Sequence, residues 1–200
     1  MSTSEQGLGG RLSLLEPDTL TAAQRELFDR ITNSAVPWAR RNGFAADTAG
    51  GHLIGPFNPS LLSPEIAAEF LKLQAVEEHY TSLDERVRQV VILTVGAVWQ
   101  APYELYAHSA VARHAGLAET VVAELVGGGL PEALTDAEKT AHRLARALST
   151  GHHVDDDLYR QAEQTFGAAG VLEVTVLTGI CHTVCGILNA FDIPAPDQDA

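Results

Sequence analysis

The segment "SLDERVRQVVILTVGAVWQAPYELYAHSAVARHAGL", residues 82–117, decides the fold. Its run from Val90 to Trp99 is apolar on nearly every side of a helix, which indicates a helix buried on more than one face. Gly116, after "AVARHA", suits the end of the helix that follows. The segment therefore predicts two consecutive helices, 83–99 and 102–115, joined by a tight turn.

Outside this segment the chain also carries helix signals and no convincing alternating strand pattern. Capping-box patterns, in which a hydroxyl and a later side chain satisfy each other's backbone N–H groups, begin at Thr21, Ser82 and Thr135. Ser63 before Pro64 is another helix start. The expected helices are 21–33, 64–80, 83–99, 102–115, 118–126, 136–149, 155–166 and 170–190. The fold class is all-α, with one long ordered loop over 42–62.

Two hundred residues are enough for one domain with a hydrophobic core. We expect a flexible N-terminal segment over 1–15, a single helical domain over 16–196 and a polar tail over 197–200. The apolar stretch 174–191 contains His182 and Asn189, so a buried core helix explains it better than a membrane span. Several helices are apolar nearly all round, which favours a homo-oligomer over a monomer.

The charge balance limits the partners. With 26 acidic residues against 13 lysines and arginines, the net charge is −13, which disfavours nucleic acid and anionic membranes. No signal peptide is visible at the start, and two cysteines make no disulfide framework, so we expect a cytoplasmic protein. An anionic small molecule remains a possible substrate if an arginine offsets the overall field.

Glu104 and His108 are the main candidates for chemistry. They stand one helical turn apart, so they share a face, and their neighbours on that face are small. Tyr103 and Tyr106 flank the pair with hydroxyls that can hold a substrate oxygen. Burial would raise the pKa of the carboxyl, and a nearby imidazolium would lower it, which suits a general acid or base. The alternative is a surface pair that contributes only a few tenths of a kcal/mol.

The same segment resembles the carboxymuconolactone decarboxylase family, the all-α superfamily that includes the AhpD alkylhydroperoxidases. The resemblance covers about residues 55–196 and is most specific over "RVRQVVILTV", "YELYAH" and "ARHAGL". The peroxidase branch carries Cys-x-x-Cys ahead of the same histidine, where this chain has Ala101 and Glu104. That substitution excludes peroxide reduction by a thiol relay. The "YEL…H" form is similar to the decarboxylase branch, whose glutamate and histidine line the active site.

The resemblance implies a lyase that needs no metal and no organic cofactor. A lactone bearing a carboxylate would lose CO₂, and its own conjugated carbonyl would accept the electrons. Glu104 or His108 would transfer the proton, and Tyr103 or Tyr106 would hold the carbonyl. An isomerase or cyclase using the same pair, or a non-catalytic small-molecule-binding oligomer, are the alternatives. The resemblance also implies a trimer or a hexamer.

Further candidates surround the pair. Arg86 is a candidate for the substrate carboxylate. Gln89 stands where family members often carry an acid, and a neutral amide can orient a group but cannot shuttle a proton. His79 precedes the helix that leads into "YELYAH" and is a candidate for substrate binding or for packing at a helix end.

Two other clusters favour structural interpretations. Cys181 and Cys185 stand four residues apart, too far for a disulfide on a regular helix, so we expect two buried core residues. The histidines and aspartates of 152–157 favour a helix start capped by Asp155 over a metal site. His52, in the long loop, can close over a pocket, but the sequence does not test this role. No metal site is predicted.

Overall fold

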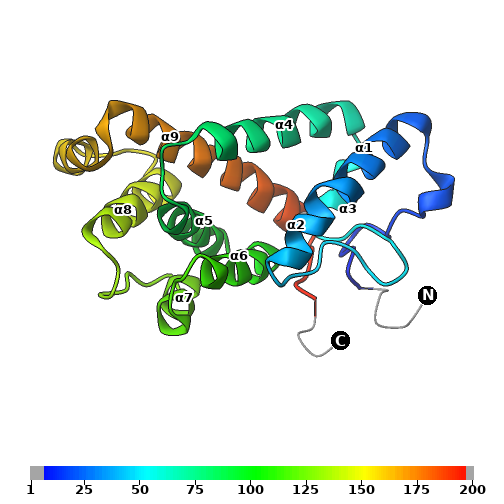
Figure 1. Ribbon diagram of the computed structural model, residues 1–200, viewed down its shortest axis with the longest axis horizontal. Coiled ribbons are helices and arrows are strands. Elements are labelled where there is room, and N and C mark those ends of the chain that lie inside the picture. Colours follow the sequence, from blue (N-terminus) through cyan, green and yellow to red (C-terminus); the bar gives the residue numbers. More distant parts are fainter. Residues whose placement is uncertain (1–6, 197–200) are drawn as a thin grey trace.

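Helix α5 (Glu85–Trp99) is the central element of the fold. The computed structural model describes residues 7–196 of the chain. Ten consecutive residues of α5, 87–96, are buried, because neighbouring helices cover the helix on several sides. These neighbours are α6 (Pro102–His114), α7 (Glu119–Val126), α8 (Asp136–Thr150) and α9 (Asp156–Ala190). Figure 1 shows α5 among them.

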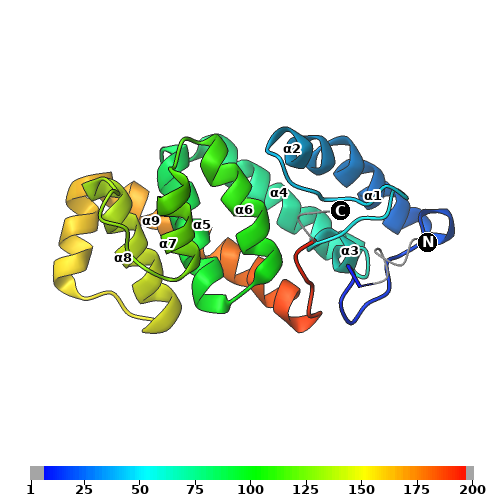
Figure 2. The same cartoon turned by 90° about the horizontal axis from the view of Figure 1, so that it is seen from below.

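The first part of the chain forms a smaller group of helices: α1 to α3 lie at one end of the molecule, and α4 runs from that end along α9 (Figures 1 and 2). Its elements are the 3₁₀ turn η1 (Pro17–Thr19), α1 (Ala22–Asn33), α2 (Ala35–Arg41), α3 (Phe57–Ser60) and α4 (Pro64–Tyr80). Between residues 7 and 196 the sheet structure is limited to one isolated bridge, Asp47 to Leu53. The all-α prediction is confirmed.

The predicted helix starts hold at two of the three capping boxes. The boxes at Thr21 and Thr135 are present in full. The box at Ser82 is wrong, because Asp84 caps α5 by accepting from the Arg86 N–H at 2.9 Å. The Ser82 hydroxyl instead donates to Glu173 Oε2 of α9 at 2.8 Å. A distant partner has replaced the local one.

The predicted helix boundaries agree with the structure, and three features differ from the prediction. Helix α2 follows α1 after a break at Ser34, and α3 forms one turn inside the expected 42–62 loop. The helices expected over 155–166 and 170–190 join as α9. Gly167 divides them, with φ 70° and ψ 169°, outside the helical region.

The N-terminal segment is held to the body of the protein where it is described. Residues 1–6 of the expected flexible segment, and the expected tail 197–200, lie outside the described residues. Further along, the Arg11 N–H donates to Phe191 O at 2.7 Å, and the Leu15 N–H donates to Asn58 Oδ1 at 3.0 Å. Residues 11–15 are therefore fixed against the C-terminal end of α9 and the turn at α3, because these bonds and the burial of Leu14 anchor them.

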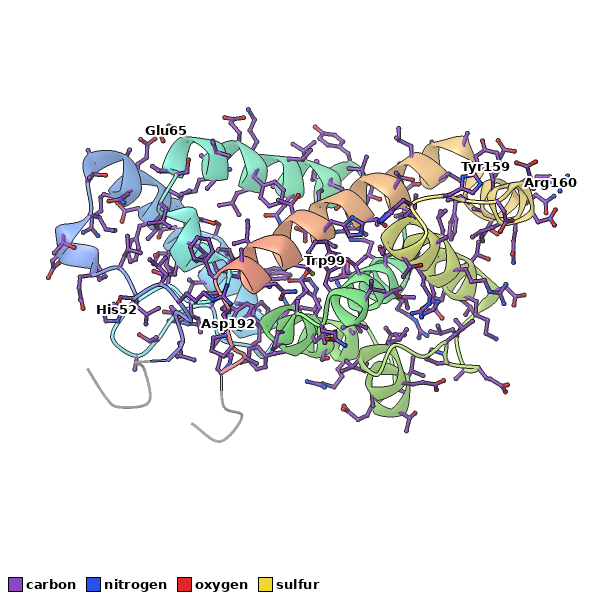
Figure 3. All side chains as sticks on the ribbon, turned by 180° about the vertical axis from the view of Figure 1, so that it is seen from behind. His52, Glu65, Trp99, Tyr159, Arg160 and Asp192 are labelled. Carbon is purple, nitrogen blue, oxygen red and sulfur yellow. The ribbon has the colours of Figure 1, made fainter. Side chains whose placement is uncertain are left out.

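Helices α4 and α9 leave apolar surface uncovered. No residue of α4 is buried, and Ile66 and Tyr80 are 73% and 75% exposed. Leu172 of α9 is 63% exposed. Within 7–196, α9 alone is long and apolar enough to cross a membrane by length and composition, and 44% of its most apolar window is buried. Figure 3 shows Glu65 near the start of α4 and Arg160 near the start of α9, where both side chains project outward.

Candidate active site

The turn between α5 and α6 brings Gln89, Glu104 and His108 together. Gln100 ends α5 in the left-handed conformation, with φ 50° and ψ 47°, and the chain reverses into α6. Gly96 lets the two helices approach closely, since a Cβ there would lie 3.0 Å from Leu105 Cδ2 and 3.5 Å from Glu104 Cγ. The local sequence thus places the face of α6 that bears the pair directly against α5.

A hydrogen-bonded chain of polar side chains runs from α5 to α6. The Gln89 amide donates through Nε2 to Glu85 Oε1 at 2.7 Å. His108 Nδ1 lies 2.9 Å from Gln89 Oε1, where its N–H donates to the amide oxygen. His108 Nε2 faces Glu104 Oε1 across 3.9 Å, which is an ionic contact distance but too long for a hydrogen bond.

Burial sets the protonation states of the pair. It raises the pKa of Glu104 to about 8. Burial lowers the pKa of His108 to about 4, and the nearby positive charge of Arg88 lowers it further in the same direction. At neutral pH the carboxyl therefore carries a proton and the imidazole is neutral. Glu104 can therefore donate a proton, and the neutral imidazole of His108 can accept one.

Arg88 is the cation of this site, and the sequence analysis missed it. Its guanidinium is buried, donates through Nη1 to Glu77 Oε1 at 2.6 Å, and lies 3.3 Å from Glu85 Oε2 through Nε. That Nε makes no hydrogen bond to any described residue. The available signal was the position of an arginine next to Gln89 in an apolar helix.

Arg86 lies elsewhere. Its Nε donates to Glu138 Oε1 at 2.7 Å, and its Nη1 donates to Gly116 O at 3.3 Å. These contacts tie α5 to α8 and to the turn after α6. These contacts do not reach Glu104 or His108, so the geometry does not support the predicted contact between Arg86 and a substrate carboxylate.

The two tyrosines hold the long loop. The Tyr103 hydroxyl donates to Ala45 O at 2.7 Å, and the Tyr106 hydroxyl accepts from the Ala45 N–H at 3.0 Å. Burial raises the pKa of Tyr103 well above its ordinary value. Gly55, with φ 62°, passes so close that a Cβ would lie 2.2 Å from the Tyr103 ring. Tyr103 is thus packed as an anchor for the loop, and its hydroxyl is not free for the predicted substrate oxygen.

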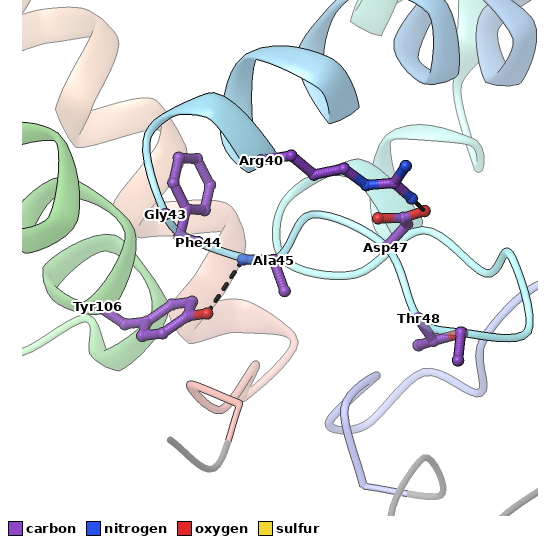
Figure 4. Close-up of a pocket in the computed structure, with 8 residues that line it drawn as sticks. Arg40, Gly43, Phe44, Ala45, Asp47, Thr48 and Tyr106 are labelled. Atoms are coloured by element: carbon purple, nitrogen blue, oxygen red, sulfur yellow. Dashed lines mark hydrogen bonds and ion pairs between the residues drawn. The ribbon is translucent and has the colours of Figure 1, made fainter. Parts of the chain in front are cut away.

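Tyr106 also lines a cavity of about 430 Å³ beside the loop (Figure 4). The full lining is Arg40, Gly43, Phe44, Ala45, Asp47, Thr48, Ala49 and Tyr106. Arg40 and Asp47 form an ion pair of 2.6 Å on its wall. Ring contacts lead from this wall to the candidate site: Phe44 to Trp38 at 5.4 Å between centroids, then Trp38 to His108 at 6.4 Å.

The remaining histidine candidates lie outside the site. His79 is exposed near the end of α4, where its ring packs against Tyr80 with centroids 4.6 Å apart. His52 is buried, with Nε2 3.0 Å from Glu16 Oε2 and Nδ1 3.3 Å from Thr48 Oγ1. His52 therefore fastens the loop to the segment before α1, and its role in closing over a pocket stays a prediction.

The cysteines and the acidic cluster have the structural roles that the sequence predicts. Cys181 and Cys185 are free and buried, and burial raises the pKa of both thiols. Asp155 caps α9 by accepting from the N–H groups of Asp157 and Leu158. Over the described residues, no group of three or more His, Cys, Asp or Glu side chains is placed to hold a metal ion.

Residues 64–147 match the model of the Carboxymuconolactone decarboxylase family. This part of the chain is similar to the carboxymuconolactone decarboxylase family. It contains Gln89, Glu104 and His108, so the whole hydrogen-bonded chain lies within the family segment. The comparison with curated proteins gives no match.

Solved structures share the fold of this chain. A peroxidase-related protein with an AhpD core from Ralstonia eutropha JMP134 is 14% identical, with a TM-score of 0.73 over 95% of this chain and 94% of that one. The debrominase Bmp8, in complex with 2,3,4-tribromopyrrole, is 17% identical, with a TM-score of 0.69 over 94% of each chain. A putative AhpD protein from Agrobacterium tumefaciens is 19% identical, with a TM-score of 0.65 over 70% of this chain and 97% of that one. At these identities the likeness shows an AhpD-like fold.

Proposed function

We propose that this protein is a cofactor-independent carboxy-lyase that acts on a small carboxylated lactone or a related unsaturated acid. The observation that carries the proposal is the Glu104–His108 pair, in which the protonated carboxyl of buried Glu104 faces a neutral imidazole nitrogen of partly buried His108 across 3.9 Å. The match of residues 64–147, which include this pair, to the Carboxymuconolactone decarboxylase family supports the reaction class. The debrominase with the same fold binds a small ring compound, which supports a small-molecule substrate.

Glu104 is the proton donor in this mechanism. The substrate carboxylate leaves as CO₂, and its bonding electrons pass into the conjugated carbonyl to give an enolate. Glu104 then transfers its proton to the enolate carbon and becomes a carboxylate. Because that carboxylate is buried, it is a strong base and regains a proton readily.

His108 returns the proton. Its side chain is 19% exposed, against 6% for Glu104, so the imidazole lies closer to solvent. The Nε2 lone pair can take a proton from solvent and pass it to the Glu104 carboxylate. One proton enters and one CO₂ leaves in each turnover, so the cycle balances without an oxidant or a reductant.

Arg88 supports the binding of an anion. The protein carries a net charge of −13, so an anionic substrate needs a local cation. Arg88 is buried between Glu77 and Glu85, and its Nε, 3.3 Å from Glu85 Oε2, makes no hydrogen bond to a described residue. We place the substrate carboxylate on the Arg88 side of the pair.

An isomerase is the second candidate. An acid and a base held 3.9 Å apart also suit the transfer of a proton between two carbons of an unsaturated acid. In that case His108 would remove the proton and Glu104 would deliver one, with no loss of CO₂.

The test is CO₂ release from 4-carboxymuconolactone by wild type, Glu104→Gln and Glu119→Gln. Glu119 is an exposed first-turn acid of α7 and serves as the matched control. We expect Glu104→Gln to lower kcat by about 10²- to 10⁴-fold and Glu119→Gln to leave it unchanged. A folded wild type that releases no CO₂ would overturn the lyase assignment, and a rearranged product that keeps its carboxylate would favour the isomerase.

We also propose a homo-oligomer, a trimer or a hexamer, that covers the apolar faces of α4 and α9. The support is the exposure of Ile66, Leu73, Val76 and Tyr80 along α4, and of Leu172 on α9. Sedimentation velocity should give a mass of three or six chains, and Leu73→Glu should lower it. Arg143→Glu, on the exposed face of α8, is the control. A monomer in the wild type would contradict the proposal.

A further inference from the structure

We propose that Glu85 is a positioning residue that sets the tautomer of His108 through the amide of Gln89. The inference deepens the proposed function, since the mechanism needs a lone pair on His108 Nε2. Glu85 does not contact the pair itself. It acts at one remove, through two consecutive hydrogen bonds that run from the start of α5 to α6.

The first bond fixes which way the Gln89 amide faces. Glu85 Oε1 lies 2.7 Å from Gln89 Nε2. A carboxylate has only acceptor oxygens, so the amide must turn its NH₂ group toward it. Arg88 Nε lies 3.3 Å from the other Glu85 oxygen and holds the carboxylate from the opposite side. The amide oxygen of Gln89 is therefore the atom that remains for His108.

The second bond fixes where the imidazole proton sits. Gln89 Oε1 lies 2.9 Å from His108 Nδ1, and an amide oxygen has no hydrogen to donate. Nδ1 must carry the hydrogen, and in a neutral imidazole Nε2 then carries the lone pair. That lone pair faces Glu104 across 3.9 Å. Because Glu85 can only accept, it orients the Gln89 amide, and the amide in turn leaves the lone pair on His108 Nε2.

Loss of Glu85 would release this constraint. The Gln89 amide could turn over and donate its NH₂ to Nδ1, and the hydrogen would move to Nε2. Nε2 would then be a donor toward Glu104, unable to accept a proton from solvent while the imidazole is neutral. The side chains of Arg88 and Trp38, which also lie near the imidazole, carry no acceptor that could hold a hydrogen on Nδ1.

A simpler reading of Glu85 is that of a first-turn acid that complements the dipole of α5, with its side chain 50% exposed. Glu65 occupies the same place on α4, where it is also exposed. The two readings differ in their consequences. A dipole role predicts a loss of stability alone, whereas a positioning role predicts a change in the histidine nitrogen signals.

The experiment is long-range ¹H–¹⁵N NMR of the imidazole groups at pH 7, in wild type, Glu85→Ala and Glu65→Ala, with the His108 signals assigned through His108→Gln. We expect wild type and Glu65→Ala to show His108 with its hydrogen on Nδ1. In Glu85→Ala this form should fall to about half or less of the population, because two amide orientations become available.

A folded Glu85→Ala protein that keeps the hydrogen wholly on Nδ1 would overturn the inference. If Glu85→Ala does not fold, Glu85→Gln replaces it, because its amide can present either end to Gln89 and should also give a mixture. The NMR readout needs no turnover, so it stands apart from the lyase test. If the lyase proposal also holds, kcat should fall in Glu85→Ala in proportion to the lost tautomer.

Discussion

Helix α6 carries polar side chains on two faces: Tyr103 and Tyr106 meet the long loop, whereas Glu104 and His108 meet α5. On the first face both hydroxyls are bonded to the backbone of Ala45. On the second face the Glu104 carboxyl has no hydrogen bond to a described residue and faces His108 Nε2 at 3.9 Å. Polar groups of the first face stabilise the fold, and those of the second are held in protonation states that suit a reaction.

The largest expected effect is the pH dependence of the reaction rate, which should follow Glu104 and His108 on the second face. If Glu104 must carry a proton, the rate constant kcat/KM should fall about tenfold per pH unit above about 8, because its carboxyl ionises there. It should also fall below about pH 4, where the His108 imidazole becomes charged. A pH–rate profile checks this. A profile that is flat between pH 7 and 10 would remove Glu104 from the chemistry.

The stability of wild type should also depend on Glu104. The folded pKa of about 8 lies above the ordinary value of 4.5, so the unfolded chain loses its proton first as the pH rises. Wild type should lose free energy of unfolding between about pH 5 and 8 relative to Glu104→Gln, by ~1.4 kcal/mol per unit of the pKa difference. Urea unfolding at several pH values measures it, and parallel curves for the two proteins would contradict the raised pKa.

A change on the face that carries Tyr103 and Tyr106 should lower the stability of the protein and leave its reaction rate nearly unchanged. Tyr103→Phe leaves the partly buried oxygen of Ala45 without its donor, and we expect a loss of about 1–3 kcal/mol in the free energy of unfolding with little change in kcat. Tyr159→Phe, at an exposed hydroxyl on α9, is the control and should change stability by less than ~0.5 kcal/mol. A strong drop in kcat for Tyr103→Phe, with stability intact, would return the hydroxyl to the reaction.

The smallest effect on the reaction is expected for a change of Arg86. Arg86 is 39% exposed but the Glu138 carboxylate that it contacts is buried, so Arg86→Ala should lower the free energy of unfolding by about 1–3 kcal/mol and leave KM unchanged. Thermal unfolding and steady-state kinetics check this. A large rise in KM would show that Arg86 does hold the substrate carboxylate and would weaken the assignment of that role to Arg88.

The sequence predicts most helices because their starts and ends depend on local chemistry, as at Thr21, Thr135 and Gly167. It misses features that depend on distant partners. Ser82 fits a capping box, but Glu173 of α9 takes its hydroxyl. Helix α2 was not predicted because it is short and contains Pro37, which a first helical turn tolerates.

The candidate site divides in the same way. The pairing of Glu104 with His108 follows from helical spacing, and the position of Gln89 was noted from the resemblance. The burial that gives Glu104 a pKa of about 8 depends on how α5, α6 and α9 pack, which spacing does not reveal. Arg86 and Arg88 have equal standing in the sequence, and only the packing shows which of the two cations lies at the site.

Gly55 has a consequence for the evolution of this chain. Its left-handed backbone and its 2.2 Å approach to the Tyr103 ring mean that position 55 has no room for any side chain while the ring is present. The two positions should therefore vary together in related sequences, with a larger residue at 55 only where 103 has lost its ring. Such paired variation would trace which relatives have kept this attachment of the loop and which have rebuilt it.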